Sequence, residues 1–441
     1  MAAMPSPGSR RWLRHGLVAV AVLLVMAGGA VAFVLAHSPH NVSNPNVEFS
    51  GPTTTTPPPA PKPVAVDNFA WPRYGFDAQR THNFQGSDPP TPPFRIGWYF
   101  QDYALLEFPP VIYQNALYLI DDDGSAKALD KRTGHKLWER KVGTLAAASP
   151  ALGISQRLMY VAVLSRNHKA THNQVPGNGV FAALSMKTGR IVWKKPIPSG
   201  TESSPIAYGN TVYFGDQGGT VYSLNATTGH VNWTYHASGA VKGGPALSNG
   251  VLFFGDYAGR AYAVSAVNGH QVWATNTSGA DFGFGSGNFY STPAVAFGRV
   301  YMGNTDGRVY SFAANNGQLA WATGTGAYVY ASPAIANTPG LGPTVYLGSY
   351  DGHFYAFDAR SGAIRWSHPS GGKISGSATI VGHVIYYSVL THRNTIGLDV
   401  RTGRPVFLFH DGAFNPVVSD DTGTIYLSGY TMLYQLLPRK H

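Results

Sequence analysis

Short runs that alternate apolar and polar residues recur along most of the chain, and turn residues separate them. One set of four reads "SSPIAYG", "NTVYFG", "GTVYSLNA" and "HVNWTY" (203–235). The alternation has a period of two, which is the period of side chains along a β-strand with one buried face. Turns such as "DQGG", "DYAG", "NTDG" and "SYDG" supply the positive φ angles that tight hairpins need. The pattern predicts sheets of four antiparallel strands.

A nine-residue phrase returns once in each set of strands, with glycine at its fifth place and a large aromatic at its ninth. Two copies read "DKRTGHKLW" (130–138) and "DARSGAIRW" (358–366), and the aromatics recur every 40 to 55 residues. This period matches a four-stranded propeller blade. A single sheet cannot bury both faces, so we expect each aromatic to dock its outer strand against the neighbouring blade. These structural docking residues are Trp98, Trp138, Trp193, Trp233, Trp273, Trp321, Trp366 and Phe407.

The two ends of the repeat region each supply part of one blade. Residues 94–100, "FRIGWYF", provide one strand with the aromatic, whereas residues 415–438 provide three strands without one. Joining them removes an exposed sheet edge. The sequence therefore predicts an all-β fold over residues 67–441, an eight-bladed β-propeller of four-stranded antiparallel blades closed by the N- and C-terminal strands.

An apolar segment precedes the repeats. Residues 16–36, "GLVAVAVLLVMAGGAVAFVLA", are uncharged and long enough as a helix to cross the ~30 Å hydrocarbon core of a membrane. Arg10, Arg11 and Arg14 come before it, which places residues 1–15 in the cytoplasm as a short basic tail. We interpret the segment as a transmembrane signal anchor of the cell membrane, with the propeller on the extracytoplasmic side.

Two further features bear on the N-terminal region. A cleaved signal peptide is the alternative to an anchor, because "AVA" (30–32) and "VLA" (34–36) resemble cleavage sites. Residues 37–66 are rich in proline and threonine, which predicts an extended, semi-rigid linker.

Composition narrows the possible functions. The net charge is +10, but no run of Lys or Arg is longer than two residues, so a nucleic-acid partner is not expected. The absence of cysteine excludes disulfides, thiolate zinc sites and c-type haem attachment. The aspartates in turns such as "DDDG" (121–124) lack the alternating spacing of a calcium loop, and we expect no metal site. His168 and His172 lie in an insertion that we interpret as an exposed basic loop.

The repeat also resembles a known family. The pattern Ala128-x-Asp130-x-x-Thr133-Gly134-x-x-x-Trp138 is similar to the tryptophan-docking repeat of the PQQ-binding-like β-propeller superfamily, and "WPRYGFDAQRT" (71–81) resembles its lead-in. The resemblance covers residues 67–438. It implies the propeller fold, and it includes both quinoprotein dehydrogenases and cofactor-free members such as the barrel-assembly lipoprotein of Gram-negative outer membranes.

This chain departs from the dehydrogenases of that superfamily. Many of them carry a vicinal disulfide beside the quinone and long inserts with calcium ligands and a catalytic aspartate. This chain has no cysteine, and no residue matches those ligands by motif. The resemblance is therefore closer to the non-catalytic members, and no cofactor is expected, with PQQ and calcium as the alternative.

A ring of variable residues marks a candidate binding site. A proline begins the first strand of most blades, and the residue three places earlier should face the mouth of the central channel. The ring contains Glu107, Ala147, Glu202, Lys242, Tyr290, Tyr330, Ser375 and Ala413. It carries charges in a chain in which only 12% of residues are charged. We predict that Glu107, Glu202, Lys242, Tyr290, Tyr330 and Ser375 form a recognition funnel, since pockets combine aromatic walls with a few polar groups. A solvated row of loops is the alternative.

A glycine- and aromatic-rich connection leads into the ring. It reads "SGADFGFGSGNFYSTP" (278–293), and long loops of this kind often carry function. We predict that it forms a rim or lid through Asp281, Phe282, Phe284 and Phe289, with a merely long blade connection as the alternative.

Two functions follow from these features. The first is a membrane-anchored, non-enzymatic binding or scaffold module for envelope proteins or cell-surface ligands. The second is a PQQ-dependent dehydrogenase that oxidises alcohols or sugars in the same funnel. No catalytic residue can be assigned, since the sequence has no recognisable Ser/His/Asp, phosphate-loop or zinc signature.

Overall fold

The computed structural model describes residues 20, 23–28, 41–51, 69–86, 89–165, 179–277, 287–415 and 417–439. The chain divides into two units, Met1–Asn41 and Val42–His441. In the first unit, residues 23–28 are helical, and the rest of the predicted span 16–36 lies almost entirely outside the described residues. Within the described ranges, no helix has both the length and the apolar character that crossing a membrane requires.

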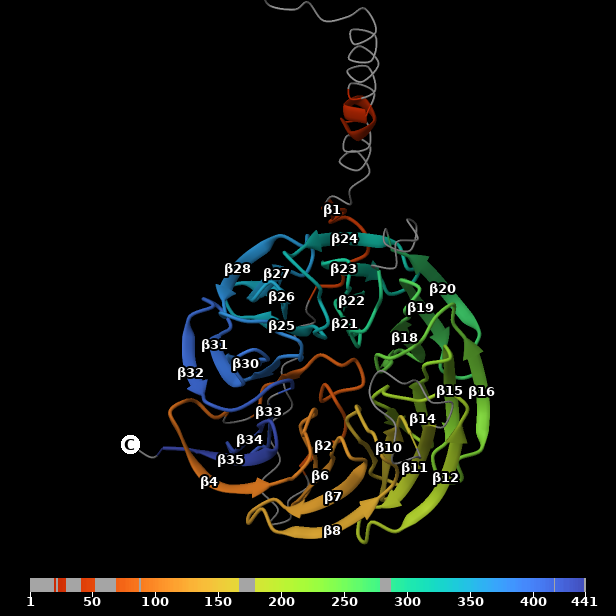
Figure 1. Ribbon diagram of the computed structural model, residues 1–441, viewed down its shortest axis with the longest axis vertical. Coiled ribbons are helices and arrows are strands. Elements are labelled where there is room, and N and C mark those ends of the chain that lie inside the picture. Colours follow the sequence, from red (N-terminus) through yellow and green to blue (C-terminus); the bar gives the residue numbers. More distant parts are fainter. Residues whose placement is uncertain are drawn as a thin grey trace, which may run out of the picture. The chain divides into compact units, whose positions relative to one another are not determined.

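The described residues of the second unit form eight four-stranded antiparallel sheets arranged as the blades of a ring (Figure 1), three of which gain one extra short strand. We number the blades by the chain order of their innermost strands. From the centre outwards, blade 1 consists of β5 (Val111–Tyr113), β6 (Ala116–Ile120), β7 (Ser125–Asp130) and β8 (Lys136–Lys141), and blade 2 consists of β9 (Ala151–Gly153), β10 (Leu158–Val163), β11 (Gly179–Ser185) and β12 (Ile191–Ile197). Blade 3 consists of β13 (Ile206–Tyr208), β14 (Thr211–Gly215), β15 (Thr220–Asn225) and β16 (Val231–His236), and blade 4 consists of β17 (Ala246–Ser248), β18 (Val251–Gly255), β19 (Arg260–Ser265) and β20 (Gln271–Asn276). Blade 5 consists of β21 (Ala294–Ala296), β22 (Arg299–Gly303), β23 (Arg308–Ala313) and β24 (Leu319–Gly324), and blade 6 consists of β25 (Ala334–Thr338), β26 (Gly342–Gly348), β27 (His353–Asp358) and β28 (Ile364–Pro369). Blade 7 consists of β29 (Thr379–Val381), β30 (Val384–Val389), β31 (Asn394–Asp399) and β32 (Pro405–Phe409), and blade 8 consists of β33 (Val417–Ser419), β34 (Ile425–Ser428), β35 (Met432–Pro438) and β4 (Phe94–Gln101).

Burial changes from the centre of a blade to its outer edge. The second strands β10 and β30 are buried along their whole length, because neighbouring blades cover both faces. The outermost strand β16 alternates between exposed and half-buried residues, because only one of its faces is covered. The predicted period-two pattern is therefore clearest on the outer strands.

The ring closes through strands from opposite ends of the chain. In blade 8, β35 pairs with β4, so that Met432 lies opposite Gln101 and Pro438 lies opposite Phe94. Lys131 of blade 1 forms an ion pair of 3.1 Å with Asp420 of blade 8, and both side chains are almost fully buried. The predicted eight-bladed all-β propeller, with one blade shared between the two chain ends, is thus confirmed.

Each recurring tryptophan contacts the blade that follows it. Its indole N–H donates a hydrogen bond of 2.9 to 3.2 Å to a backbone carbonyl of that blade. The donor and acceptor residues are Trp98 and Lys131, Trp138 and Met186, Trp193 and Ala226, Trp233 and Ala266, Trp273 and Ala314, Trp321 and Ala359, and Trp366 and Val400. The glycine of the repeated phrase lies against the indole of the preceding blade: a β-carbon on Gly134 would come within 2.6 Å of Trp98. Glycine and aromatic therefore recur together because they meet across every such joint.

Phe407 replaces tryptophan at the joint between blades 7 and 8 for a structural reason. The third and fourth strands of blade 8 come from different ends of the chain, so no hairpin turn connects them. Phe407 packs edge to face against Phe94, with the ring centroids 5.5 Å apart. The carbonyl of Phe94 accepts a hydrogen bond from Nε of Arg439. Phenylalanine suits this joint because it needs no acceptor.

A segment before the first blade crosses the middle of the ring (Figure 1). Its strand β2 (Ala70–Trp71) pairs with β5, and β3 (Asn83–Phe84) pairs with β29. Between them, carbonyls accept N–H groups from the inner ends of several blades. The donor and acceptor residues are Leu152 and Pro72, Leu247 and Ala78, Val295 and Gln79, Ile335 and Thr81, and Ile380 and His82. The lead-in seen in the sequence is therefore the floor of the central channel.

Arg80 anchors this floor. Its side chain is fully buried, and its guanidinium donates hydrogen bonds to the carbonyls of Tyr74, Ser204, Pro205 and Pro245. Burial lowers the pKa of Arg80 to about 9, and the nearby charge of Arg73 adds to this effect. The floor is thus joined to blades 3 and 4 by a buried cation that donates hydrogen bonds to backbone oxygens.

Part of the predicted linker runs along blade 5. The strand β1 (Val42–Ser43) pairs with β24, with Ser43 opposite Trp321. Arg299, which is fully buried, donates hydrogen bonds of 2.6 and 2.9 Å to the carbonyls of Val47 and Glu48. Here the structure differs from the spacer that proline and threonine content predicted, because residues 42–50 complete the hydrogen bonds of an edge strand and of a buried arginine. We refer to residues 42–50 as the strap.

We expect the strap to stabilise the propeller. Val47 and Phe49 pack on the apolar cluster of blades 5 and 6, and the guanidinium of Arg299 lies 5.2 Å from the Phe49 ring centroid. Replacing Val47 and Phe49 together by serine should lower the free energy of unfolding by about 2 kcal/mol, since two half-buried apolar side chains are lost. Urea denaturation of the full chain measures this, with Asn46→Ser, at an exposed strap position, as the control. Equal midpoints for the two variants would show that the strap adds no stability.

Candidate functional site

A collar of small polar side chains surrounds the central channel. In several blades, a polar residue stands directly before the proline of the inner strand, or before Ala378 in blade 7. Its side-chain oxygen accepts a hydrogen bond from a backbone N–H of the preceding blade. The donor and acceptor residues are Ser149 and Ser204, Gly244 and Thr292, Thr292 and Ser332, Ser332 and Ser377, and Ser377 and Asn415, at distances from 2.7 to 3.0 Å. The prolines were predicted to mark the inner strands, but this collar was not predicted. Its signal was the serine, threonine or asparagine that repeatedly precedes them.

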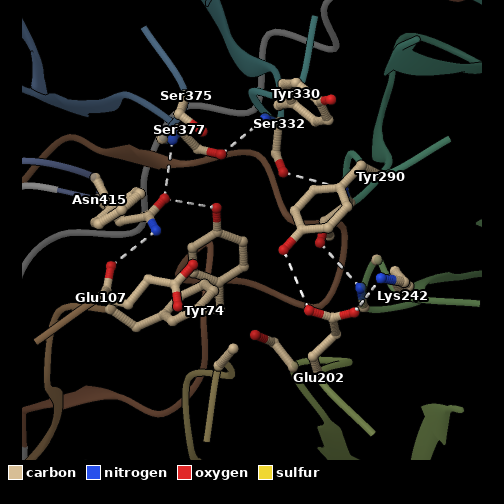
Figure 2. Close-up of a pocket in the computed structure, with 18 of the residues that line it drawn as sticks. Tyr74, Glu107, Glu202, Lys242, Tyr290, Tyr330, Ser332, Ser375, Ser377 and Asn415 are labelled. Atoms are coloured by element: carbon tan, nitrogen blue, oxygen red, sulfur yellow. Dashed lines mark hydrogen bonds and ion pairs between the residues drawn. The ribbon is translucent and has the colours of Figure 1, made fainter. Parts of the chain in front are cut away.

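The collar leads into a cavity of about 260 Å³ at the centre of the propeller (Figure 2). All members of the predicted ring except Ala413 line it, and Phe414 lies at the corresponding place. The convergence follows from the repeat, because each residue occupies the same position relative to the inner strand of its blade. Whether these residues bind a ligand remains a prediction.

One wall of the cavity is an ion pair fixed by neighbours. Oε1 of Glu202 lies 2.8 Å from Nζ of Lys242 and accepts a hydrogen bond of 2.9 Å from Nε2 of Gln217. The hydroxyl of Tyr290 donates a hydrogen bond of 3.3 Å to Oε2 of the same carboxylate (Figure 2). Lys242 also lies 4.8 Å from the ring centroid of Tyr257. This cation is therefore already neutralised by a carboxylate and placed over an aromatic face.

The adjoining wall is built from tyrosines. The ring of Tyr330 meets Tyr290 edge to face, with centroids 5.5 Å apart, and its centroid lies 4.9 Å from that of Tyr350. The hydroxyl of Tyr350 lies 3.5 Å from that of Ser375. Tyr257 and Tyr350 were not predicted as site residues, although each stands in an Asp-Gly-type turn whose tip faces the channel mouth. Their signal was an aromatic at a turn position where exposed polar residues are usual.

Glu107 is the unpaired acid of the cavity. Its backbone carbonyl accepts a hydrogen bond of 3.1 Å from Asn415, whose side-chain oxygen accepts one of 3.0 Å from Tyr74 (Figure 2). Its carboxyl group accepts no hydrogen bond from the part of the chain that the structure describes. Burial, together with the negative charges of Glu202 and Asp122, raises the pKa of Glu107 to about 8. Among the described residues, this acid at the cavity wall therefore has no counter-ion.

The predicted rim differs from its expected position where the structure describes it. Phe289 is fully buried and packs against Tyr310 and Phe312, with ring centroids 5.9 and 6.5 Å apart. It therefore belongs to the apolar core between blades 4 and 5, because a phenyl ring gains more from this seam than from water. Asp281, Phe282 and Phe284 lie outside the described residues.

The carboxylates of the turn aspartates accept hydrogen bonds from groups in or next to their own turns. Oδ1 of Asp216 accepts the backbone N–H groups of Gly218 and Thr220, and Oδ2 accepts the hydroxyl proton of Tyr222. Asp256 makes the equivalent bonds in blade 4. In the described ranges, His, Asp and Glu side chains form no group of three able to hold a metal ion.

With the geometry established, comparison with known proteins gives the family. A family model described as "Outer membrane protein assembly factor BamB" matches residues 102–207 and 176–407. The chain belongs to the BamB family of β-propellers. The predicted resemblance to PQQ-binding-like repeats is thereby confirmed, while a search of curated proteins found no match.

Several solved structures share the fold of this BamB-family propeller. BamB from Moraxella catarrhalis is 16% identical, covers 79% of this chain and 99% of its own, and superposes with a TM-score of 0.61. The quinohemoprotein alcohol dehydrogenase from Comamonas testosteroni is 13% identical, covers 84% of this chain and 81% of its own, with a TM-score of 0.66. A europium-containing methanol dehydrogenase is 12% identical, covers 83% and 98%, with a TM-score of 0.67. At these identities, the likeness shows the fold alone.

Proposed function

We propose that this BamB-family chain is a non-enzymatic binding or scaffold module, anchored in the cell membrane by one helix and facing the extracytoplasmic side. Its partners would be envelope proteins or cell-surface ligands. The observation that supports a binding role is the central cavity, in which ring residues from seven blades meet. Charged and aromatic groups that converge in one concave site are typical of recognition.

The chemistry of the cavity does not fit PQQ. PQQ is a tricarboxylate, and the lining residues present the carboxyl groups of Glu107 and Glu202. Lys242 is the single cation among the lining residues that the structure describes, and it is paired with Glu202. Calcium needs six to eight oxygen ligands, and the described residues gather no suitable group of acids. We therefore derive no catalytic step through a quinone.

Alanine at Glu202, Lys242 and Tyr330 together should abolish partner binding. The three side chains supply the ion pair and part of the tyrosine wall, whereas the blade joints lie elsewhere. Removing both members of an ion pair leaves no charge unpaired, so the thermal midpoint should stay within about 2 °C of the wild type. Proximity labelling around the full, membrane-bound chain measures partner binding. The readout is the set of envelope proteins that are labelled with the wild type but not with the triple variant.

Two results would contradict the proposed function. Unchanged labelling in the triple variant would show that the cavity is not the binding site. A stoichiometric complex of the full chain with PQQ and calcium, with alcohol- or sugar-dependent dye reduction, would establish the dehydrogenase instead. Glu139→Ala, at an exposed position of an outer strand, serves as the control for both experiments.

A further inference from the structure

We propose that the central cavity binds a cationic nitrogen group, an ammonium or guanidinium, with Glu107 as its counter-ion. This inference rests on the proposed function, because it names the ligand chemistry of the same site. The group would belong to a small amine or to a lysine or arginine side chain of a protein partner.

Among the described residues, the Glu107 carboxyl group is isolated from positive charge. The titratable groups that act on it are Glu202, Asp122, Tyr74 and Tyr290, and none of these can bring a positive charge. Lys242 is held 2.8 Å from Glu202 and so does not serve Glu107. An ionised acid in a partly dry cavity is costly unless it is paired. A bound cation would supply the missing partner.

The tyrosine wall also favours a cationic ligand. The face of an aromatic ring carries partial negative charge and attracts cations within about 6 Å of its centroid. The chain already uses its tyrosines in this way: Nζ of Lys242 lies 4.8 Å from the Tyr257 centroid, and Nζ of Lys373 lies 5.4 Å from that of Tyr350. Tyr290, Tyr330 and Tyr350 line the cavity itself.

The net charge of the cavity lining favours a cationic ligand as well. Glu202 and Lys242 neutralise each other, so the lining carries one negative charge when Glu107 is ionised. A single cation balances that charge. An anionic ligand would instead face two carboxyl groups, and a neutral ligand would leave Glu107 uncharged or unpaired.

The charge of Glu107 gives binding a defined pH dependence. Its pKa is raised to about 8 in the empty cavity, so the group is mostly protonated at pH 6 and must release its proton when a cation binds. The affinity for a permanently charged ligand should therefore rise about tenfold per pH unit from pH 6 and level off above pH 8. A ligand without charge should show no such rise.

Isothermal titration calorimetry of the full chain tests this with three probes at pH 6, 7, 8 and 9. The probes are choline, its neutral carbon isostere 3,3-dimethylbutan-1-ol, and a short lysine-containing peptide. We expect the cationic probes to bind at least tenfold more tightly than the isostere, and Glu107→Gln to remove this difference. Glu139→Gln is the matched control. Binding of choline and the peptide alike would indicate a small amine, and binding of the peptide alone would indicate a protein side chain.

Several outcomes would overturn the inference. They are equal affinity for choline and its isostere, the absence of binding by both cationic probes, and unchanged binding in Glu107→Gln at an unchanged thermal midpoint. Proximity labelling keeps this test separate from that of the proposed function. If labelling still depends on the cavity while the cationic probes do not bind, only the cationic ligand is refuted.

Discussion

Gly362→Ala is expected to destabilise the propeller by about 3 kcal/mol, although it adds a single methyl group. Gly362 has a φ of +75°, and a β-carbon there would lie 2.6 Å from Cδ2 of Trp321 and 2.7 Å from Oγ1 of Thr323. The left-handed conformation costs an alanine about 1 kcal/mol. Overpacking against a ring that cannot move adds about 1–3 kcal/mol. Trp321 cannot move because it is fully buried and hydrogen-bonded to Ala359.

A second glycine separates these two costs. Gly250 has nearly the same φ, +74°, but a β-carbon there would meet nothing within 4 Å. Gly250→Ala should therefore cost only the conformational term, about 1 kcal/mol. Chemical denaturation of both full-length variants gives the comparison. Equal losses would show that the contact between glycine and indole does not hold the blades together.

Arg80→Met should cost about 4 kcal/mol, because it removes the cation that joins the floor of the channel to the blades. Four carbonyl groups, those of Tyr74, Ser204, Pro205 and Pro245, would lose their donor in a buried site. Each buried polar group left without a partner costs roughly 1–3 kcal/mol, and local relaxation recovers part of that sum. Methionine approximates the length of arginine, so the loss reports the hydrogen bonds more than the packing.

Arg190→Met is the control for this variant. Arg190 is exposed at a hairpin of blade 2, and its replacement should change the free energy of unfolding by less than about 0.5 kcal/mol. Thermal unfolding and hydrogen exchange of the inner strands measure the difference. If the hydrogen bonds of Arg80 to the floor and the blades did not stabilise the fold, both variants would show the same small change in the free energy of unfolding.

The cavity shows how far repeat symmetry carries a prediction. Glu202, Lys242, Tyr290 and Tyr330 could be placed from the sequence, because each stands three residues before a proline that marks an inner strand. Glu107 could be placed in the same way, but its isolation could not be foreseen. The isolation of Glu107 depends on the ion pair that Lys242 forms with Glu202, and only side-chain geometry determines this pairing.

Turn residues illustrate the opposite limit. Tyr257 and Tyr350 occupy tight turns, where the sequence pattern accounts for the aspartates and glycines but gives no reason for an aromatic. In the structure these turns stand next to the cavity: the ring of Tyr257 packs against Tyr290 of blade 5, and the hydroxyl of Tyr350 lies 3.5 Å from that of Ser375 of blade 7. Phe289 shows the same limit, because an aromatic in a glycine-rich connection is as compatible with a buried seam as with an exposed rim.

The sequence by itself determined the ring: alternation gave the strands, the glycine and aromatic phrase gave the joints, and the split repeat gave the closure between β35 and β4. These features are local and repeated, so each copy reports the same geometry. Tertiary structure alone decided that residues 42–50 bind blade 5, that the segment between β2 and β3 closes the channel, and that Glu107 has no counter-ion among the residues that the structure describes. Each of these depends on contacts between residues far apart in the chain, and such contacts leave no periodic mark on the sequence.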